Sequence, residues 1–322
     1  MDPSQPESFN HRTEVLATGR TYHFIDQLPA NYDPKRHPTL LCIHGFPDSW
    51  YGWRYQIGPW VRRGYRVVAP DMLGYGGSSK PTAPEEYTTK KLSADLAALL
   101  DLLRIRRAVV IGHDWGSYAA GRISVPYTPP SKIYLPLPEV VKRAPNLGYQ
   151  LYFEDPESSS EIQSHLGTFI NMVYKDQEGK STHPELSFTA EGALRKILRN
   201  PETPADVSIE RAFYLQELGK GMHGPLNYYR TSLHRHEEER DASLPAELRS
   251  DLSYLFIWGT KDPTATPFVI SKAQKFIKNY RDIAIEGRGH WLMVEAKDEI
   301  TQHVSNWLQE LTCSLPKRAT KL

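Results

Sequence analysis

The chain has 322 residues, 39% of them hydrophobic and 24% charged, which is enough for one large domain or a domain with an insertion to bury a full core. Its 39 lysines and arginines against 38 aspartates and glutamates leave a formal net charge of +1, which argues against nucleic acid or an anionic membrane surface as a partner. No apolar run reaches transmembrane length, and Cys42 and Cys313 are too far apart in sequence to indicate a disulfide framework or a metal cluster.

Strands and helices alternate through the first third of the chain. Residues 12–28 alternate loosely between apolar and polar and predict two strands separated at Gly19 and Arg20. The continuous apolar run over residues 38–43 is typical of a strand buried on both faces of a parallel sheet. Further strands are predicted at residues 65–70 and 109–111, and helices at residues 50–63 and 88–104. Such alternation indicates βαβ units and an α/β fold with a parallel sheet.

The pattern changes between residues 126 and 245, where prolines cluster and short helices fit better than strands. Strand and helix patterns resume afterwards. They predict strands at residues 252–259 and 281–285 and helices at residues 268–279 and 299–311. The sequence therefore predicts a core domain formed by residues 1–125 and 246–322, interrupted by a helical cap domain of residues 126–245.

The most informative stretch follows the strand at residues 109–111 and reads Gly112-His113-Asp114-Trp115-Gly116. Two glycines flank Asp114 at the spacing of a nucleophile elbow, a tight strand-to-helix turn that exposes its central side chain above the sheet. An aspartate at the centre is already an anion and can attack a saturated carbon to form an ester, whereas a serine must first lose a proton. Taken alone, the same spacing is also typical of a strand-end aspartate that caps the next helix.

Two further polar residues follow predicted strands. Asp262 comes after the strand at residues 252–259, and His290 comes after the strand at residues 281–285. Because ligands bind outside the carboxyl ends of the strands in an open parallel sheet, Asp114, Asp262 and His290 can converge there. Their order along the chain, nucleophile then acid then histidine, is that of the α/β hydrolases.

Together with four other pieces of sequence, these features resemble the epoxide hydrolases of the α/β-hydrolase fold, of the soluble or fungal type. The matching pieces are His44-Gly45-Phe46-Pro47, the turn around Asp114, Tyr149-Gln150-Leu151-Tyr152-Phe153, Leu226-Asn227-Tyr228-Tyr229-Arg230 and Gly289-His290-Trp291. They extend from about residue 15 to residue 310, so the resemblance covers nearly the whole chain. It implies a small-molecule epoxide and water as partners, and neither a metal nor an organic cofactor.

The resemblance implies a role for each matched side chain. Asp114 attacks an epoxide carbon, while Tyr149 and Tyr229 from the cap donate hydrogen bonds to the epoxide oxygen. A water molecule then cleaves the alkyl-enzyme ester, and His290, which is held by Asp262, takes the proton of that water.

Backbone and substrate contacts follow from the same resemblance. The N–H groups of Phe46 and Trp115 are the implied oxyanion donors, and Gln150 and Trp115 are the implied substrate contacts. Ordinary packing in a helical cap stays an alternative for the two tyrosines. The neighbouring Tyr152 and Tyr228 are alternatives for the two donors.

Two other functions stay open on the sequence. A haloalkane dehalogenase shares the fold, the aspartate nucleophile and the ester intermediate, but it needs tryptophan or asparagine N–H donors for the halide where this chain offers cap tyrosines. The other is an α/β-hydrolase scaffold that is impaired in catalysis and only binds a ligand or partner. A serine esterase does not fit, because Ser117 lies outside the centre of the elbow.

The impaired alternative rests on a short connection after the elbow. The family carries a long helix and a sixth strand at this point, whereas here Gly121 and Arg122 run directly into Ile123-Ser124-Val125-Pro126. A return along a five- or six-residue strand takes about eleven to thirteen helical residues, and the stretch from Trp115 to Arg122 has eight. The sequence therefore predicts a stunted helix, a sixth strand that is missing or reduced to a stub, and a chain that folds poorly or lacks activity.

Both ends of the sequence bear on its cellular location. The polar start, Met1-Asp2-Pro3-Ser4, has no signal-peptide core, which predicts an intracellular protein. The last residues, Thr320-Lys321-Leu322, differ by one residue from the Ser-Lys-Leu signal for peroxisomal import. The cytoplasm and the peroxisome are therefore the expected compartments.

Overall fold

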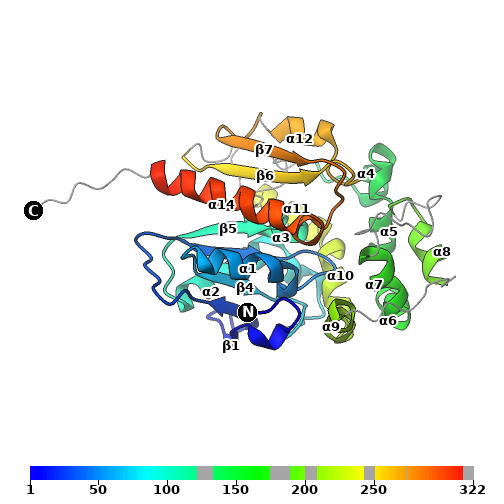
Figure 1. Ribbon diagram of the computed structural model, residues 1–322. Coiled ribbons are helices and arrows are strands. Elements are labelled where there is room, and N and C mark those ends of the chain that lie inside the picture. The colour runs from blue at the N-terminus through cyan, green and yellow to red at the C-terminus, as the bar shows by residue number, and fades with distance from the viewer. Residues whose placement is uncertain (122–132, 175–188, 200–208, 243–250, 274, 315–322) are drawn as a thin grey trace, which may run out of the picture.

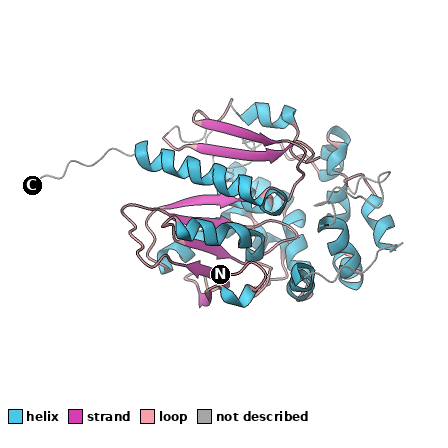
Figure 2. Cartoon of the chain, viewed as in Figure 1, coloured by secondary structure: helices cyan, strands magenta, loops and turns pink. Residues whose placement is uncertain are grey.

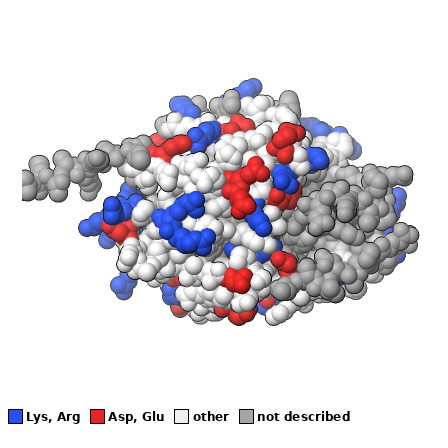
Figure 3. All heavy atoms as spheres, in the orientation of Figure 1, with Lys and Arg blue, Asp and Glu red and all other residues white. Residues whose placement is uncertain are grey.

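The computed structural model describes residues 1–121, 133–174, 189–199, 209–242, 251–273 and 275–314 (Figure 1). Both boundaries predicted for the cap domain, at residues 125/126 and 245/246, lie outside these ranges. The same is true of the C-terminal Thr320-Lys321-Leu322. Within the described ranges, no helix is both long enough and apolar enough to cross a membrane. Acidic and basic side chains both occur on the face shown in Figure 3.

Five strands form one sheet, in the order β1-β2-β4-β3-β5. They are β1 (His11–Val15), β2 (Thr21–Gln27), β3 (Thr39–Ile43), β4 (Val67–Pro70) and β5 (Ala108–Gly112). The predicted break between the first two strands is confirmed, because Gly19 has a φ of 81° in the turn that joins them. β1 pairs antiparallel with β2, and β2 with β4, whereas β3 runs parallel to both β4 and β5. The sheet is therefore mixed, with its parallel strands toward β5.

Two later strands form a second, parallel sheet. These strands are β6 (Tyr254–Gly259) and β7 (Tyr280–Ile285). Among the described residues, no strand lies between β5 and β6, so the β-structure is divided into two sheets. Figure 1 shows the long helix α14 (Lys297–Ser314) running across the boundary between them in this view.

Helices flank the strands and gather beyond one end of them (Figures 1 and 2). The described helices before β5, after β7 and next to the strands are η1 (Pro6–Ser8), η2 (Trp50–Trp53), α1 (Arg54–Arg62), η3 (Pro84–Tyr87), α2 (Thr89–Leu102), α3 (Trp115–Gly121), α12 (Pro267–Ala273), α13 (Leu292–Glu295) and α14. Those between α3 and β6 are α4 (Leu137–Arg143), α5 (Tyr149–Glu154), α6 (Ser158–Ser164), α7 (Leu166–Tyr174), α8 (Ala193–Arg199), α9 (Ile209–Leu218), α10 (His223–Arg230) and α11 (Ser232–Asp241). The described part of residues 126–245 is thus helical, as its sequence pattern predicts.

Two predicted helices differ from the observed ones at their ends. Helix α2 buries Leu92, Leu96 and Leu99 on its apolar face and stops where Arg104 takes a φ of 55°, close to the predicted end. The helix predicted over residues 268–279 is too long, since α12 ends at Ala273. The amides of Phe276 and Ile277 donate hydrogen bonds to the carbonyl oxygen of Ala273. They form a turn that leads the chain into β7.

Helix α3 is described over seven residues and reaches Gly121, where this described range ends. The short helix predicted after the elbow, with fewer than the roughly eleven residues that a return along β5 requires, therefore stays a prediction. Residues 123–125, predicted as the stub of a sixth strand, lie outside the described residues. The consequence expected for folding and activity stays a prediction.

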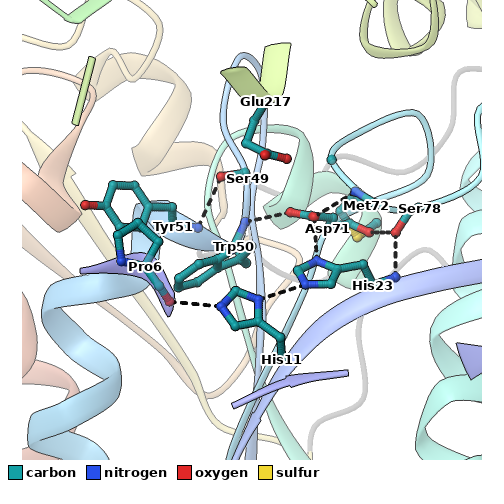
Figure 4. A network of polar contacts seen from close by, with 12 residues as sticks. Pro6, His11, His23, Ser49, Trp50, Tyr51, Asp71, Met72, Ser78 and Glu217 are labelled. Carbon is teal, nitrogen blue, oxygen red and sulfur yellow. Dashed lines mark hydrogen bonds and ion pairs between the residues drawn. The ribbon is translucent and has the colours of Figure 1, made fainter. Parts of the chain in front are cut away.

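A polar network fastens the N-terminal segment to the loop that follows β4 (Figure 4). The Asp71 carboxylate, 1% exposed, accepts a hydrogen bond from His23 Nδ1 at 2.7 Å and from the Trp50 amide at 3.2 Å. His23 Nε2 lies 2.9 Å from His11 Nδ1, and His11 Nε2 lies 2.9 Å from the carbonyl oxygen of Pro6. Through Trp50, the network braces the turn that contains Phe46.

Candidate active site

Asp114 sits at the tip of a tight turn between β5 and α3. Its φ of 51° lies in the left-handed region, which is a strained position for a residue other than glycine. A Cβ at Gly116 would lie 2.1 Å from the carbonyl oxygen of Ile43, and a Cβ at Gly112 would lie 2.6 Å from Ser117 Cα. Both flanking glycines are therefore required, as an elbow geometry demands.

One oxygen of the Asp114 carboxylate is held by the backbone. The Phe46 amide donates to Oδ1 at 2.8 Å, and the Trp115 amide also hydrogen-bonds the carboxylate. A Cβ at Gly45 would lie 2.4 Å from this Asp114 oxygen, so only glycine allows the two turns to approach this closely. The two N–H groups predicted as oxyanion donors thus both reach the carboxylate of Asp114.

The other Asp114 oxygen faces a histidine–aspartate pair. His290 Nε2 lies 3.7 Å from Asp114 Oδ2, and His290 Nδ1 lies 2.8 Å from Asp262 Oδ2. The second oxygen of Asp262 accepts from the amide and the hydroxyl of Thr264, at 2.8 and 2.7 Å. Asp114, Asp262 and His290 follow β5, β6 and β7, so the convergence predicted at the strand ends is observed.

The charges of this triad stabilise one another. Burial disfavours the imidazolium, but the neighbouring carboxylates of Asp114 and Asp262 outweigh it and raise the pKa of His290 to about 10. Burial also opposes ionisation of Asp262, yet its bonds to His290 and Thr264 lower its pKa to about 2. The pKa of Asp114 is lowered in the same way, since His290 and the Trp115 amide outweigh burial. At neutral pH the resting site therefore holds an imidazolium between two carboxylates.

Two tyrosines of the helices between α3 and β6 lie near Asp114. Tyr149 begins α5 and Tyr229 lies on α10, with their ring centroids 6.3 Å apart and both side chains buried. Burial, and then the negative charge of Asp114, raise the pKa of both phenols. Both hydroxyl groups are therefore protonated at neutral pH and able to donate a hydrogen bond.

These groups share one cavity of about 860 Å³. Its lining includes Asp114, Trp115, Tyr149, Gln150, Tyr229, Asp262 and His290. Gln150 and Trp115, predicted as substrate contacts, are thus at the cavity wall. Among the alternatives for the donors, Tyr228 donates its hydroxyl to the carbonyl of Leu73 at 3.0 Å, and neither Tyr228 nor Tyr152 lines the cavity. The geometry favours the pair Tyr149 and Tyr229.

Two residues that position His290 were not predicted from the sequence. The Glu295 carboxylate accepts from the amides of Gly289 and Trp291, at 2.6 and 2.8 Å, and so clamps the backbone on both sides of His290. His113 Nε2 donates to the carbonyl oxygen of His290 at 2.9 Å. Burial, and then the charge of His290, lower the pKa of His113 to about 4, so His113 acts as a neutral donor. An acidic residue in the short helix that follows His290, α13, was the available signal for Glu295.

Asp48 is a second carboxyl group buried near the nucleophile. It is fully buried, and its Oδ1 accepts from the Tyr214 hydroxyl at 2.9 Å and from the Ser49 amide at 2.8 Å. Its Oδ2 has no hydrogen-bond partner among the described residues. Burial raises the pKa of Asp48 to about 7, and the charge of Asp114 adds to the rise, although Arg54 opposes it.

This environment predicts a pH-dependent contribution of Asp48 to stability. An unfolded chain releases this proton near the ordinary pKa of 3.8, whereas the folded chain keeps it up to pH about 7. The folded state binds more protons in between, so the free energy of unfolding falls as the pH rises from 4 to 7. Asp48→Asn should remove this fall, which is on the order of 4 kcal/mol at most. Urea unfolding at several pH values measures it, with exposed Asp101→Asn as the control for a lost surface charge. Identical pH profiles for Asp48→Asn and the unmodified chain would show that Asp48 ionises normally.

Comparison with known proteins agrees with this arrangement. Residues 38–133 match the family model of the alpha/beta hydrolase fold. The chain is 32% identical to epoxide hydrolase A of Mycobacterium tuberculosis, over 85% of this chain and 91% of that protein. It is 30% identical to mouse bifunctional epoxide hydrolase 2 over 95% of this chain, but spans only 57% of that protein.

A solved structure extends the similarity to three dimensions. Epoxide hydrolase A from Mycobacterium thermoresistibile superposes with a TM-score of 0.77 at 28% sequence identity, covering 94% of this chain and 98% of that one. The fold, the order of the triad along the chain and the sequence relatives all indicate the same family. The chain belongs to the epoxide hydrolases of the α/β-hydrolase fold.

Proposed function

We propose that this chain converts an epoxide to a vicinal diol through an ester formed on Asp114. One observation carries the proposal. The Asp114 carboxylate accepts hydrogen bonds from two backbone N–H groups, with Phe46 on Oδ1, while Oδ2 faces His290 in a cavity that two protonated tyrosines also line. A nucleophile, an acid and a base thus meet in one place.

In the first step, Asp114 Oδ2 attacks one carbon of the epoxide and the ring C–O bond breaks. The released electron pair leaves an alkoxide on the second carbon. Tyr149 and Tyr229 donate hydrogen bonds to this oxygen, and the alkoxide takes a proton from one of them. The high pKa values of the two phenols keep both donors protonated until ring opening makes the oxygen basic.

In the second step, water attacks the carbonyl carbon of the Asp114 ester and His290 takes its proton. The negative charge develops on Oδ1, where the N–H groups of Phe46 and Trp115 receive it. The ester C–O bond then breaks, the diol leaves with the proton returned by His290, and Asp114 keeps the oxygen of the water. Asp262 stays ionised and balances the imidazolium.

Formation of the ester also prepares His290 for its role. In the resting site, the carboxylates of Asp114 and Asp262 raise the pKa of His290 to about 10, which makes it a poor base. Alkylation turns Asp114 into a neutral ester and removes one of these charges. The pKa of His290 then falls, so that His290 can return a proton to the tyrosinate left by the first step and then accept a proton from water.

We assign residues 126–245 as the cap because α5 and α10 carry Tyr149 and Tyr229 into the cavity. The core then supplies the nucleophile and the base, while the cap supplies the acid. A small-molecule epoxide and water are the proposed partners, and the cytoplasm or the peroxisome is the proposed compartment.

The proposed reaction is tested by measuring products. Purified chain incubated with a simple aryl epoxide should release the vicinal diol, and with a primary haloalkane it should release no halide. The reason is that phenol hydroxyls protonate an alkoxide, whereas a dehalogenase needs N–H donors at the halide. Halide release without diol formation would replace the epoxide hydrolase reaction by a dehalogenase reaction.

A further inference from the structure

The division of the β-structure leaves a space with two strand walls. The cavity that contains Asp114 continues along β5 and β6, and residues 108–112 and 254–258 line it over nearly the full length of both strands. On the side toward α14, its lining includes Ile300, Val304 and Trp307. Val110 is 37% exposed although it lies at the centre of β5. The space is therefore a slot between two strands, with an apolar cover.

Backbone groups of β5 point into this slot. The His113 amide donates to the carbonyl oxygen of Ile43, so His113 is directed toward β3. Successive residues of a strand direct their N–H and C=O groups to opposite sides. The groups of Ala108, Val110 and Gly112 therefore face away from β3, on the side where β5 has no strand neighbour among the described residues.

The same reasoning applies to β6. The Tyr254 amide donates to the carbonyl oxygen of Asn279, so even-numbered residues of β6 pair with β7. The N–H and C=O groups of Leu255 and Ile257 then face the opposite side, where the described residues place no strand next to β6. Each wall of the slot thus presents a row of strand hydrogen-bonding groups.

The chemistry of these walls selects the occupant. A hydrocarbon chain would fit the apolar cover, but it would bury the N–H and C=O groups of both strands without partners, at a cost of about 1–3 kcal/mol for each. An extended peptide has donors and acceptors on both of its edges at the spacing of a strand. Such a peptide satisfies both walls, and apolar side chains suit its covered faces.

We propose that the slot between β5 and β6 binds an extended apolar peptide segment of a partner polypeptide, which adds a strand and joins the two sheets. The segment spans about five residues, the length of β5, contains no proline, and carries β-branched or aliphatic side chains. This inference rests on the fold alone and does not depend on the proposed reaction.

Binding in the slot has a consequence for the site. Asp114 follows β5, whereas Asp262 and His290 follow β6 and β7, so the 3.7 Å approach of His290 to Asp114 spans the two sheets. A strand between them fixes their separation. We expect a bound segment to raise the melting temperature and, in an active chain, to accelerate cleavage of the Asp114 ester.

The test uses a fluorescein-labelled peptide of five valine, isoleucine and threonine residues, flanked by lysines for solubility. Its control has the same sequence with N-methyl groups on alternate amides, which removes the donors of one edge. We expect saturable binding of the first peptide, at least tenfold weaker binding of the second, and a rise in melting temperature with the first alone. Equal affinity for both peptides, or no saturable binding of either, would overturn the proposal.

A protein variant and an exchange measurement locate the binding. Val110→Pro removes a slot-facing N–H and leaves the residues that pair with β3 intact, so it should weaken binding at least tenfold while circular dichroism stays unchanged. Hydrogen–deuterium exchange on the unmodified chain does not depend on that variant folding. The peptide should slow exchange of the Val110, Leu255 and Ile257 amides, and unchanged exchange at all three would reject the slot as the binding site. Diol formation without these effects would leave the proposed reaction standing and the slot proposal rejected.

Discussion

Asp114→Ala is expected to abolish epoxide turnover, with a loss large enough to leave no product above background. No other described carboxylate lies at the tip of a glycine-framed turn with backbone donors on one oxygen and a histidine facing the other. Without Asp114, no ester forms and the two-step route is closed. Diol production by purified Asp114→Ala at more than background rate would contradict the assignment of Asp114 as the nucleophile.

His290→Gln should fail at a different step. Alkylation of Asp114 needs no base, so the ester should still form, but water loses its proton acceptor and the ester should accumulate. Mass spectrometry of this variant after mixing with epoxide should show one substrate-sized adduct on the peptide that contains Asp114. An adduct on another peptide, or none with a substrate that the unmodified chain turns over, would reject this division of labour between Asp114 and His290.

The two tyrosines give the second large effect. Tyr149→Phe or Tyr229→Phe should each slow alkylation by roughly one to three powers of ten, the usual range for a lost general acid or oxyanion donor. The double variant should retain little activity, because the alkoxide then leaves without a donor. Pre-steady-state measurement of ester formation isolates this step from the later hydrolysis.

A neighbouring tyrosine provides the matched control. Tyr152 lies on the same helix as Tyr149 and is also buried, but it does not line the cavity. Tyr152→Phe should therefore alkylate at nearly the rate of the unmodified chain. Normal alkylation by the Tyr149→Phe, Tyr229→Phe double variant, or an equal loss in Tyr152→Phe, would assign the tyrosines to packing.

The parts of the site that are local in sequence could be predicted from it. The elbow needs only a strand, two glycines and a central Asp114, because backbone sterics alone create the turn. Asp262 and His290 could be placed because each follows a strand, and parallel strands end at the same edge of a sheet. The helical character of the described part of residues 126–245 likewise followed from their proline-rich, non-alternating pattern.

Other parts depend on contacts between distant segments and could not be predicted. The high pKa of Asp48 arises from burial beneath Tyr214, which is 166 residues away and marked by no motif. The donation from His113 to the His290 carbonyl spans 177 residues. Spacing along the chain carries no information about such contacts, because tertiary packing alone creates them.

The gap between β5 and β6 could be predicted only in part from the sequence. The short connection after the elbow predicts a stunted helix, of which the structure describes seven residues, up to Gly121. The sequence did not indicate that the triad would still assemble across two separate sheets, with His290 within 3.7 Å of Asp114. The hydrogen bond between His113 and the His290 carbonyl also spans the two sheets. We expect the gap to lower the free energy of unfolding, and a low melting temperature would show this loss of stability.

The central claim, hydrolysis through an ester on Asp114, is tested most directly by following the oxygen of water. A single turnover with the protein in excess over epoxide is run in water enriched in oxygen-18. Because water attacks the carbonyl carbon of the ester, the heavy oxygen should appear in the carboxylate of Asp114, and the first diol released should carry none. Heavy oxygen in that first diol, with none in the peptide containing Asp114, would mean that water attacks the epoxide directly and would contradict the account.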